Sequence, residues 1–460
     1  MAQNTSLHTF DIPENSMKNI MRAWLILGVC ALAAAGVYSI LPVLFRSPAF
    51  QEYIPFKDFF HTAIVVHVDL SVMVWMLAIS SMLWALLGDP RFHTVYMTAF
   101  IVAALGTLAI AVAPFIHEAN PLMNNYIPVL QNPVFFLGLA LFACAILLQV
   151  GATFLSFLPG RISEEERTSQ RYGIYYAAII TAVALVAFVL SYIQIMASPD
   201  LQSFGMEHFY ELVFWGGGHT LQFTYTHMMV IAWLWLATGN GYTVHVKEQF
   251  INFLLSLNVM LVIPGLVIYF VHKADAPEHI EFFTQQMRIG LGIAPAVIGA
   301  FIIWAFVTQE RPILRSTPEF SSLLCSIFLF ATGGIVGYLI SGYNVTIPAH
   351  YHGSIVGITL AFMGLVYHFL PKLGFGKIEG KMATIQPYIY GGGQLLHVIG
   401  LGVSGGYGVL RKTAGANVDP QAYVWMGMIV IGGLFAILGG LLFVIVAVRA
   451  LLHKEKQREV

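Results

Sequence analysis

Residues 348–371 read PAHYHGSIVGITLAFMGLVYHFLP, an apolar segment that opens with two histidines, His350 and His352. Roughly 20 consecutive apolar residues cross the hydrocarbon core of a bilayer as an α-helix, so this stretch predicts a membrane helix. On an α-helix, residues i and i+2 point about 200° apart, so the two imidazoles leave opposite faces. Ionisable residues inside a membrane are costly and usually mark a functional site. One helix can therefore hold two separate metal centres, one on each side.

Similar apolar stretches recur along the whole chain. Of its 460 residues, 58% are hydrophobic and only 10% are charged, and the mean hydropathy is +0.76. Soluble domains carry about 25% charged residues, so a soluble fold is excluded. The sequence predicts an all-α, polytopic membrane bundle that forms a single membrane domain over residues 1–460. About twelve transmembrane helices are expected, near residues 18–45, 61–88, 92–115, 131–158, 173–197, 210–238, 249–272, 285–308, 319–342, 348–371, 385–410 and 422–450.

The basic residues predict the orientation of this bundle. Lys and Arg accumulate in the loops on one side of the predicted helices, and cytoplasmic loops of membrane proteins carry such an excess. We therefore expect both termini, residues 1–17 and 452–460, to be cytoplasmic tails. Arg411 and Lys412 are among the few basic residues expected on the outer side.

Further histidines are expected at the same depth as the pair. In this orientation, His67, His219 and His272 fall in one layer near the outer third of the bilayer, together with His350 and His352. Imidazole is a common axial ligand of haem iron and also binds copper or non-haem iron. The pattern therefore favours redox chemistry with haem. No Cys-x-x-Cys-His sequence is present, so a covalently attached c-type haem is not expected.

Four stretches carry a family resemblance: residues 214–223 (FWGGGHTLQF), 282–295, 349–371 and 394–412. In order and spacing they resemble the sixth, eighth, tenth and eleventh helices of the catalytic subunit I of the haem-copper oxidase and nitric oxide reductase superfamily. The tenth helix of that family carries a His-x-His signature. The eleventh helix is followed by a basic pair that binds haem propionates. The resemblance covers most of the chain and implies the same bundle.

The resemblance also implies roles for the histidines. His67 and His352 would be the axial ligands of a low-spin haem of b type. His350 would be the proximal ligand of a high-spin haem whose other face stays open for substrate. His61 lies on a nearby turn and is an alternative to His67 as the ligand. The basic pair after the eleventh helix would neutralise the haem propionates.

A second metal is implied as well, facing the open side of the high-spin haem. His219 and His272 would hold this one non-haem metal, copper or iron. The family usually has two adjacent histidines at the end of the seventh helix, whereas this chain has only His272 there. A third ligand would have to come from elsewhere, and the candidates are Asp275, Glu278, His279 and Gln222.

The sixth helix departs from the oxygen-reducing members. They commonly carry a tyrosine four residues after the histidine, but here Gln222 is followed by Phe223. Splitting dioxygen takes four electrons, and a phenol near the metals can provide one of them. Coupling two molecules of nitric oxide takes only two electrons and no phenol. We therefore expect catalysis at His219, His272, Gln222 and Phe223, with nitric oxide as the substrate.

Proton supply is expected from the outer side. Leu221 stands where many pumping oxidases carry a carboxylate. Glu211 and Glu281 are the better candidates because they lie at helix ends near the site. A route from the cytoplasm along Thr224 and Tyr225 is the alternative. The further candidates for proton supply on the outer side are Glu118, Glu207 and Glu278.

The sequence thus predicts a membrane-bound respiratory oxidoreductase that reduces nitric oxide to nitrous oxide. The alternative is a terminal cytochrome c oxygen reductase, with or without proton pumping. A third interpretation, of another class, is a haem-bearing electron-transfer subunit or gas sensor without turnover. We expect a cupredoxin-like or cytochrome c subunit at the outer face and a soluble electron donor. The expected location is the bacterial cytoplasmic membrane, and no pattern indicates nucleic-acid binding.

Overall fold

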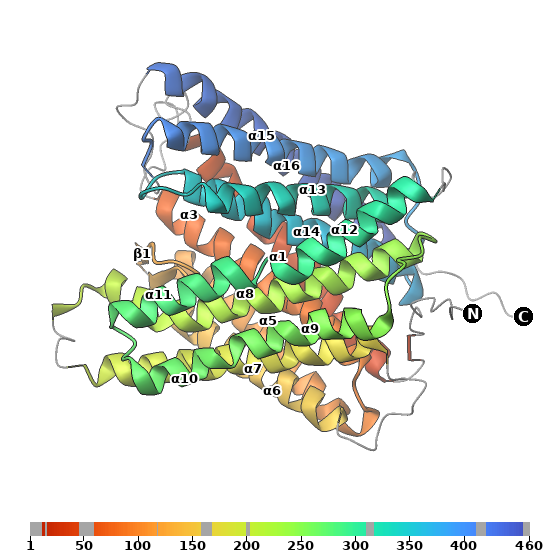
Figure 1. The fold of residues 1–460 in the computed structure, drawn as a ribbon, viewed down its shortest axis with the longest axis horizontal. Coiled ribbons are helices and arrows are strands. Elements are labelled where there is room, and N and C mark those ends of the chain that lie inside the picture. The colour runs from red at the N-terminus through yellow and green to blue at the C-terminus, as the bar shows by residue number, and fades with distance from the viewer. Residues whose placement is uncertain are drawn as a thin grey trace, which may run out of the picture. The chain divides into compact units, whose positions relative to one another are not determined.

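A computed structural model of the chain describes residues 12–13, 16–45, 59–116, 118–157, 168–198, 203–309, 317–410 and 420–453 (Figure 1). Most of these residues are helical. The helices are α1 (Met17–Phe45), α3 (Phe59–Val68), η1 (Asp69–Val74), α4 (Trp75–Leu86), η2 (Pro90–Phe92), α5 (His93–Ile116), α6 (Pro133–Ser156), α7 (Ser169–Met196), α8 (Met206–Gly239), α9 (Glu248–Val262), α10 (Pro264–Val271), α11 (Pro277–Gln285), η5 (Gln286–Gly290), α12 (Ile293–Thr308), α13 (Pro318–Tyr338), α14 (Thr346–Lys372), α15 (Lys381–Gly406) and α16 (Pro420–Leu452).

Each apolar stretch expected from the sequence coincides with one helix or with one run of consecutive helices. Ten helical segments among the described residues are long and apolar enough to cross a membrane. Large apolar side chains such as Phe270 (82% exposed) and Val307 (76% exposed) lie on the outside of these helices. Helices satisfy their own backbone polar groups, as a bilayer requires. The all-α polytopic bundle is confirmed, and the chain is a multi-pass membrane protein.

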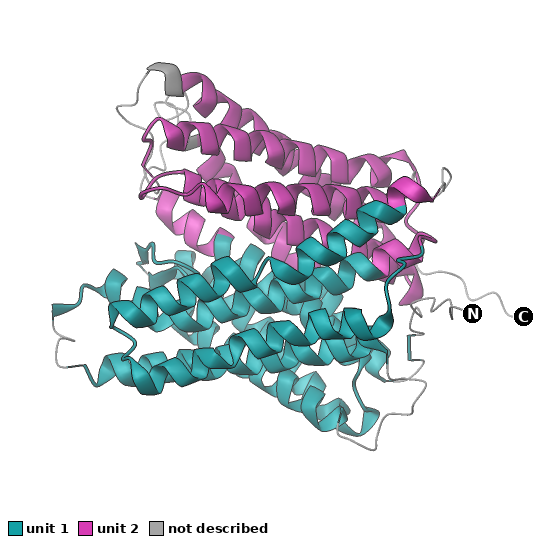
Figure 2. Ribbon diagram, viewed as in Figure 1, with its two compact units in different colours: residues 1–28, 68–234, 243–305 teal, residues 29–67, 235–242, 306–460 magenta. Residues whose placement is uncertain are grey.

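The chain divides into two compact units (Figure 2). Unit 1 comprises residues 1–28, 68–234 and 243–305. Within it, α7 packs against α6, α9 and α10 (Figure 1). The helices α5 and α6 approach closely at Gly106 and Gly138, where a Cβ on Gly106 would lie 2.8 Å from the Gly138 carbonyl oxygen. Small residues permit such contacts between membrane helices.

Unit 2 comprises residues 29–67, 235–242 and 306–460. Its central helix is α14, which packs against α13, α15 and α16. The helices α13 and α14 meet at two glycines, and a Cβ on Gly333 would lie 2.6 Å from the carbonyl carbon of Gly353. This close approach brings the first turns of α14 against the backbone of α13.

A short β-hairpin in unit 1 was not expected from the sequence. Its strands, β1 (Asn120–Leu122) and β2 (Val129–Gln131), pair antiparallel with Asn120 opposite Gln131. Asn132 follows directly, and its side chain accepts two backbone N–H groups at the start of α6, where Pro133 takes the first position. Both features favour a helix start. Because Asn132 also donates to the Ala113 carbonyl in α5, the hairpin is fastened to both neighbouring helices.

Candidate functional site

His350 lies in the first turns of α14, beside α13. Its Nδ1 is 2.8 Å from the carbonyl oxygen of Gly333. A carbonyl only accepts, so Nδ1 carries the hydrogen and Nε2 keeps its lone pair. Histidines that bind metals commonly donate their other N–H in this way. Gly337 leaves room for the ring, because a Cβ there would lie 2.6 Å from Nδ1 of His350.

His67 repeats this arrangement elsewhere in unit 2. Its Nδ1 donates to the carbonyl oxygen of Ala35 in α1, at 2.9 Å. The alternative ligand, His61, lies earlier in α3, where its ring meets Phe60 edge-on. The shared Nδ1–carbonyl geometry with His350 favours His67 over His61 as a haem ligand.

His352 faces a different helix from His350. Its ring lies 4.6 Å from the ring of His397 in α15, whereas His350 contacts α13. The two imidazoles therefore leave α14 in different directions, as their spacing predicts. His397 is buried and donates from Nδ1 to the Ile429 carbonyl of α16, at 2.8 Å. The structure therefore places His397 directly against His352.

Unit 2 thus offers a donor set that suits haem iron. In His67 and His350 the hydrogen sits on Nδ1, which makes Nε2 the nitrogen that can bind a metal. The predicted propionate partners, Arg411 and Lys412, lie outside the described residues. The described segment before them ends at Leu410, which forms a β-bridge with Asn344, just before α14.

Replacing His67 tests the choice between the two ligand candidates. We expect His67→Ala to lose the bis-imidazole spectrum of the low-spin haem, because one of its two axial ligands is removed. Its matched control, His61→Ala, should keep that spectrum. Reduced-minus-oxidised absorption spectra of the purified protein decide between them, and loss of the low-spin bands in the His61 variant alone would reverse the assignment.

His219 is buried in α8 of unit 1, directly after three glycines. Its Nδ1 donates to the carbonyl oxygen of Trp215, at 2.8 Å. Its Nε2 lies 2.9 Å from the hydroxyl of Tyr126. Both ring nitrogens therefore have partners within unit 1. Sequence reasoning missed Tyr126, because no local pattern connects it to a histidine 93 residues away.

Tyr126 lies in the loop of the β-hairpin, and its side chain contacts α8 closely at Gly218. Its ring centre is 4.6 Å from that of His219 and 6.0 Å from that of Trp215. A Cβ on Gly218 would collide with the tyrosine. The other two glycines of the run also face aromatic rings. The glycine run therefore makes room for aromatic side chains around His219.

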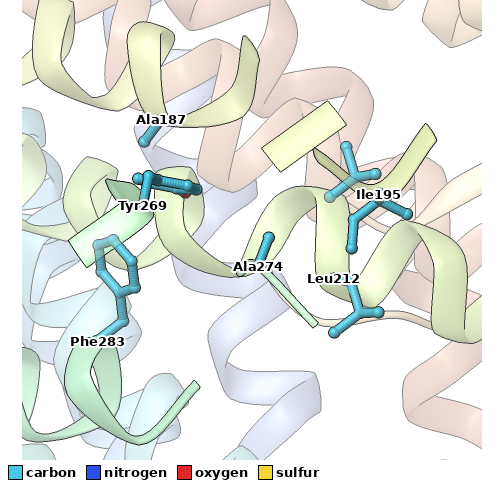
Figure 3. Packing of buried hydrophobic residues seen from close by; sticks show 7 residues of the cluster. Ala187, Ile195, Leu212, Tyr269, Ala274 and Phe283 are labelled. Atoms are coloured by element: carbon cyan, nitrogen blue, oxygen red, sulfur yellow. The ribbon is translucent and has the colours of Figure 1, made fainter. Parts of the chain in front are cut away.

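Two of the candidate metal ligands, His272 and His279, lie in the same unit. His272 ends α10 in an extended conformation; its side chain is 38% exposed, and its Nδ1 is 4.0 Å from the Glu278 carboxylate. His279 in α11 is buried, and neither of its ring nitrogens has a hydrogen-bond partner. Its ring centre lies 4.6 Å from that of Tyr269 and 5.0 Å from that of Phe283. Figure 3 shows these two aromatic rings in the apolar cluster of this region.

The second-metal site implied by the resemblance is not assembled by these side chains. Within the described ranges, no three His, Cys, Asp or Glu residues gather closely enough to hold a metal ion. Nε2 of His219 has a hydroxyl partner, and the side chain of His272 is partly exposed. Of the other candidates, Asp275 accepts from a serine hydroxyl and Gln222 is half-buried in α8. In this arrangement the side chains do not fit a metal ion held by His219 and His272. Metal binding by these two histidines stays a prediction.

Phe223 lies one turn after His219 and is fully buried. Its ring packs in an apolar cluster with Ile180, Val183 and Val262. Leu221, two residues before Phe223, is also buried. Neither position supplies a hydroxyl or a carboxylate to this part of α8.

The two carboxylates favoured for proton supply have local partners. Glu211 in α8 accepts a hydrogen bond from the backbone N–H of Asn125, at 2.6 Å. It also accepts one from the side-chain amide of Asn125. Glu281 is exposed and accepts from Gln285 one turn later, at 2.6 Å. Glu211 therefore anchors the hairpin loop onto α8, which sequence reasoning did not anticipate.

Comparisons with known proteins identify the family of the chain as a whole. The family model described as "Cytochrome C and Quinol oxidase polypeptide I" matches residues 19–435. The chain belongs to this family. It is also 32% identical to an uncharacterized protein of Rickettsia prowazekii (strain Madrid E) over 498 residues, which cover 94% of this chain and 95% of the relative. An uncharacterized protein of Aquifex aeolicus (strain VF5) is 26% identical over 369 residues, covering 79% and 88%. As a member of this family, the chain is a membrane oxidoreductase of the haem-copper oxidase type.

Proposed function

We propose that this chain is the catalytic subunit of a respiratory enzyme that reduces nitric oxide to nitrous oxide. Family membership supports respiratory oxidoreduction, and the ring orientations of His67 and His350 support binding of a low-spin and a high-spin haem. When bound, the haems supply one-electron transfer and an iron that binds the gas. Two molecules of nitric oxide, two electrons and two protons give nitrous oxide and water.

The observation that carries the choice of gas is the environment of Phe223. Its ring is buried among aliphatic side chains, so α8 offers no hydroxyl where oxygen-reducing members commonly place a phenol. Nitric oxide coupling needs two electrons fewer than dioxygen cleavage and no phenol. The buried Leu221 accords with this reading, because no carboxylate is present there to feed a proton pump.

One observation favours dioxygen as a second candidate substrate. Tyr126 brings a phenol to 2.9 Å from Nε2 of His219, from a loop rather than from α8. An oxygen reductase that recruits its tyrosine from another position would need such a residue.

Gas consumption by the purified, haem-loaded complex separates the two candidates. With ascorbate and a redox mediator as the electron source, we expect nitric oxide to be consumed much faster than dioxygen, with one nitrous oxide formed per two nitric oxide molecules. His350→Ala is the control for background chemistry, since the gas-binding haem would be lost. Faster consumption of dioxygen, with water as the product, would establish the second candidate instead.

Electron delivery and location extend the proposal. A cupredoxin-like or cytochrome c subunit at the outer face would pass electrons from a soluble donor to the low-spin haem. The cytoplasmic membrane of a bacterium, with both termini in the cytoplasm, accords with the basic loops of the sequence. The two similar proteins named above are bacterial as well.

A further inference from the structure

We propose that Tyr126 is a positioning residue that holds the imidazole of His219 in one tautomer and one orientation, and that Glu211 keeps Tyr126 in place. The inference rests on the proposed function only where it assigns His219 to the gas-reduction site. The hydrogen bond and its anchor concern unit 1 alone and are testable without turnover.

The direction of the hydrogen bond follows from the two partners of His219. The Trp215 carbonyl oxygen can only accept, so Nδ1 of His219 must be the donor there. A neutral imidazole then has its lone pair on Nε2, and the Tyr126 hydroxyl, 2.9 Å away, donates to it. The pair of contacts selects the Nδ1–H tautomer and stops the ring from turning over.

The backbone conformation of Tyr126 indicates that the contact with His219 is a specific feature of the fold. Its φ is +66°, and among the described residues no other non-glycine residue has a positive φ. Bulky side chains rarely adopt this left-handed conformation, and residues that do so cluster at functional sites. Contacts with neighbouring residues must therefore hold this loop in its conformation.

Glu211 supplies that constraint from α8. One carboxylate oxygen accepts the backbone N–H of Asn125 at 2.6 Å, and the other accepts the Asn125 side-chain amide. Hydrogen bonds to a carboxylate are stronger than those between neutral groups. The residue directly before Tyr126 is thus fixed at two points to the helix that carries His219.

The phenol ring is also held by packing. Trp215 meets it edge-on, and the indole N–H of Trp215 donates to the Ile280 carbonyl of α11, at 3.0 Å. On the other side, Gly218 has no Cβ, and one there would overlap the tyrosine. The tyrosine therefore has one position available, and in that position its hydroxyl reaches His219.

The consequence is that a phenol reaches His219 from outside α8, which carries Phe223 one turn after the histidine. Phe223 is turned into an apolar cluster, while Tyr126 arrives from the hairpin loop. Any group that binds Nε2 of His219 must first displace this hydroxyl. Tyr126 and Glu211 together therefore set the tautomer and the ring orientation of His219.

The test compares Tyr126→Phe, which removes only the hydroxyl, with Tyr269→Phe as a matched control. Tyr269 is a buried tyrosine of the same unit whose hydroxyl bonds to Ser191, at 2.7 Å, and not to His219. In the haem-loaded complex labelled with nitrogen-15 histidine, the His219 signal is identified by its loss in His219→Gln. We expect Tyr126→Phe to shift the Nε2 signal toward that of a free acceptor, and the control to leave it unchanged. An unchanged signal in Tyr126→Phe would overturn the proposal.

A double-mutant cycle tests the anchor. Glu211→Ala and Tyr126→Phe should each lower gas consumption by roughly ten- to hundredfold, because a misplaced group near the reacting atoms costs about that much. The double variant should be no slower than Tyr126→Phe alone, since Glu211 acts through Tyr126. If the losses of gas consumption multiply in the double variant, Glu211 does not act through Tyr126 and the proposed anchor is wrong. Should the single variants assemble poorly, Asn125→Ala removes one anchor bond and should shift the same His219 signal. Slow gas consumption in the unmodified complex would argue against the proposed function and leave the nitrogen-15 result intact.

Discussion

Alanine at position 350 is expected to remove the high-spin haem and leave the low-spin haem in place, whereas alanine at position 352 should do the reverse. His350 turns toward α13 and His352 toward α15, so we expect each to serve a different centre. Iron without its protein ligand is poorly retained. Both variants should lose gas consumption, but pyridine-haemochrome analysis should count one haem per chain instead of two. Carbon monoxide difference spectra, which report the open haem, should vanish only in His350→Ala.

The control for this pair is His368→Ala on the same helix. His368 lies far along α14, where its ring contacts Trp235 and Phe369. Its replacement should leave both haem spectra intact. Retention of both pigments in the variants of His350 and His352 would contradict the haem assignment altogether. Loss of both pigments from either one, with the protein still folded, would show that one centre cannot form without the other.

A single methyl group at Gly333 is expected to destabilise the protein by about 1–3 kcal/mol, the usual cost of overpacking a filled interior. A Cβ there would lie 2.6 Å from a backbone atom of Gly353, which cannot move aside as a side chain can. The Gly333 carbonyl also accepts the hydrogen bond from His350. Gly333→Ala should therefore lower the temperature at which the high-spin haem is released, followed by its absorption during heating in detergent.

The next residue provides a matched comparison. A Cβ on Gly334 would meet nothing within 4 Å. Alanine is a better helix former than glycine by roughly 0.5–1 kcal/mol, so Gly334→Ala should hold or raise the release temperature. Equal behaviour of the two variants would show that the contact between α13 and α14 does not support His350.

Much of the fold follows from local sequence, because a membrane helix needs only length and apolar composition. The stretch that became α14 was predicted as residues 348–371 and runs from Thr346 to Lys372. Breaks and irregular turns within the helices were harder to predict. Pro264 ends α9 and starts α10, as expected from its missing N–H. The π-helical turn at Asp69–Val74 has no such local signal.

The directions in which His350 and His352 leave α14 were also predictable, because the spacing of two residues sets the faces of the helix from which their rings project. What the spacing could not supply is each hydrogen-bond partner. The carbonyls that orient His67 and His350 belong to other helices, and the contact of His352 with His397 joins α14 to α15. These partners are distant in sequence and become neighbours only through packing.

The amino-acid sequence by itself determined the membrane bundle, the family and the histidines that suit haem, since hydropathy and spacing along one helix are local properties. The tertiary structure alone decided the surroundings of His219. Tyr126 reaches it from a hairpin loop 93 residues away, and Glu211, a candidate for proton supply, fastens that loop to α8. The physical reason is that a hydrogen bond between remote segments depends on backbone geometry, such as the positive φ at Tyr126, and no local pattern of residues encodes it.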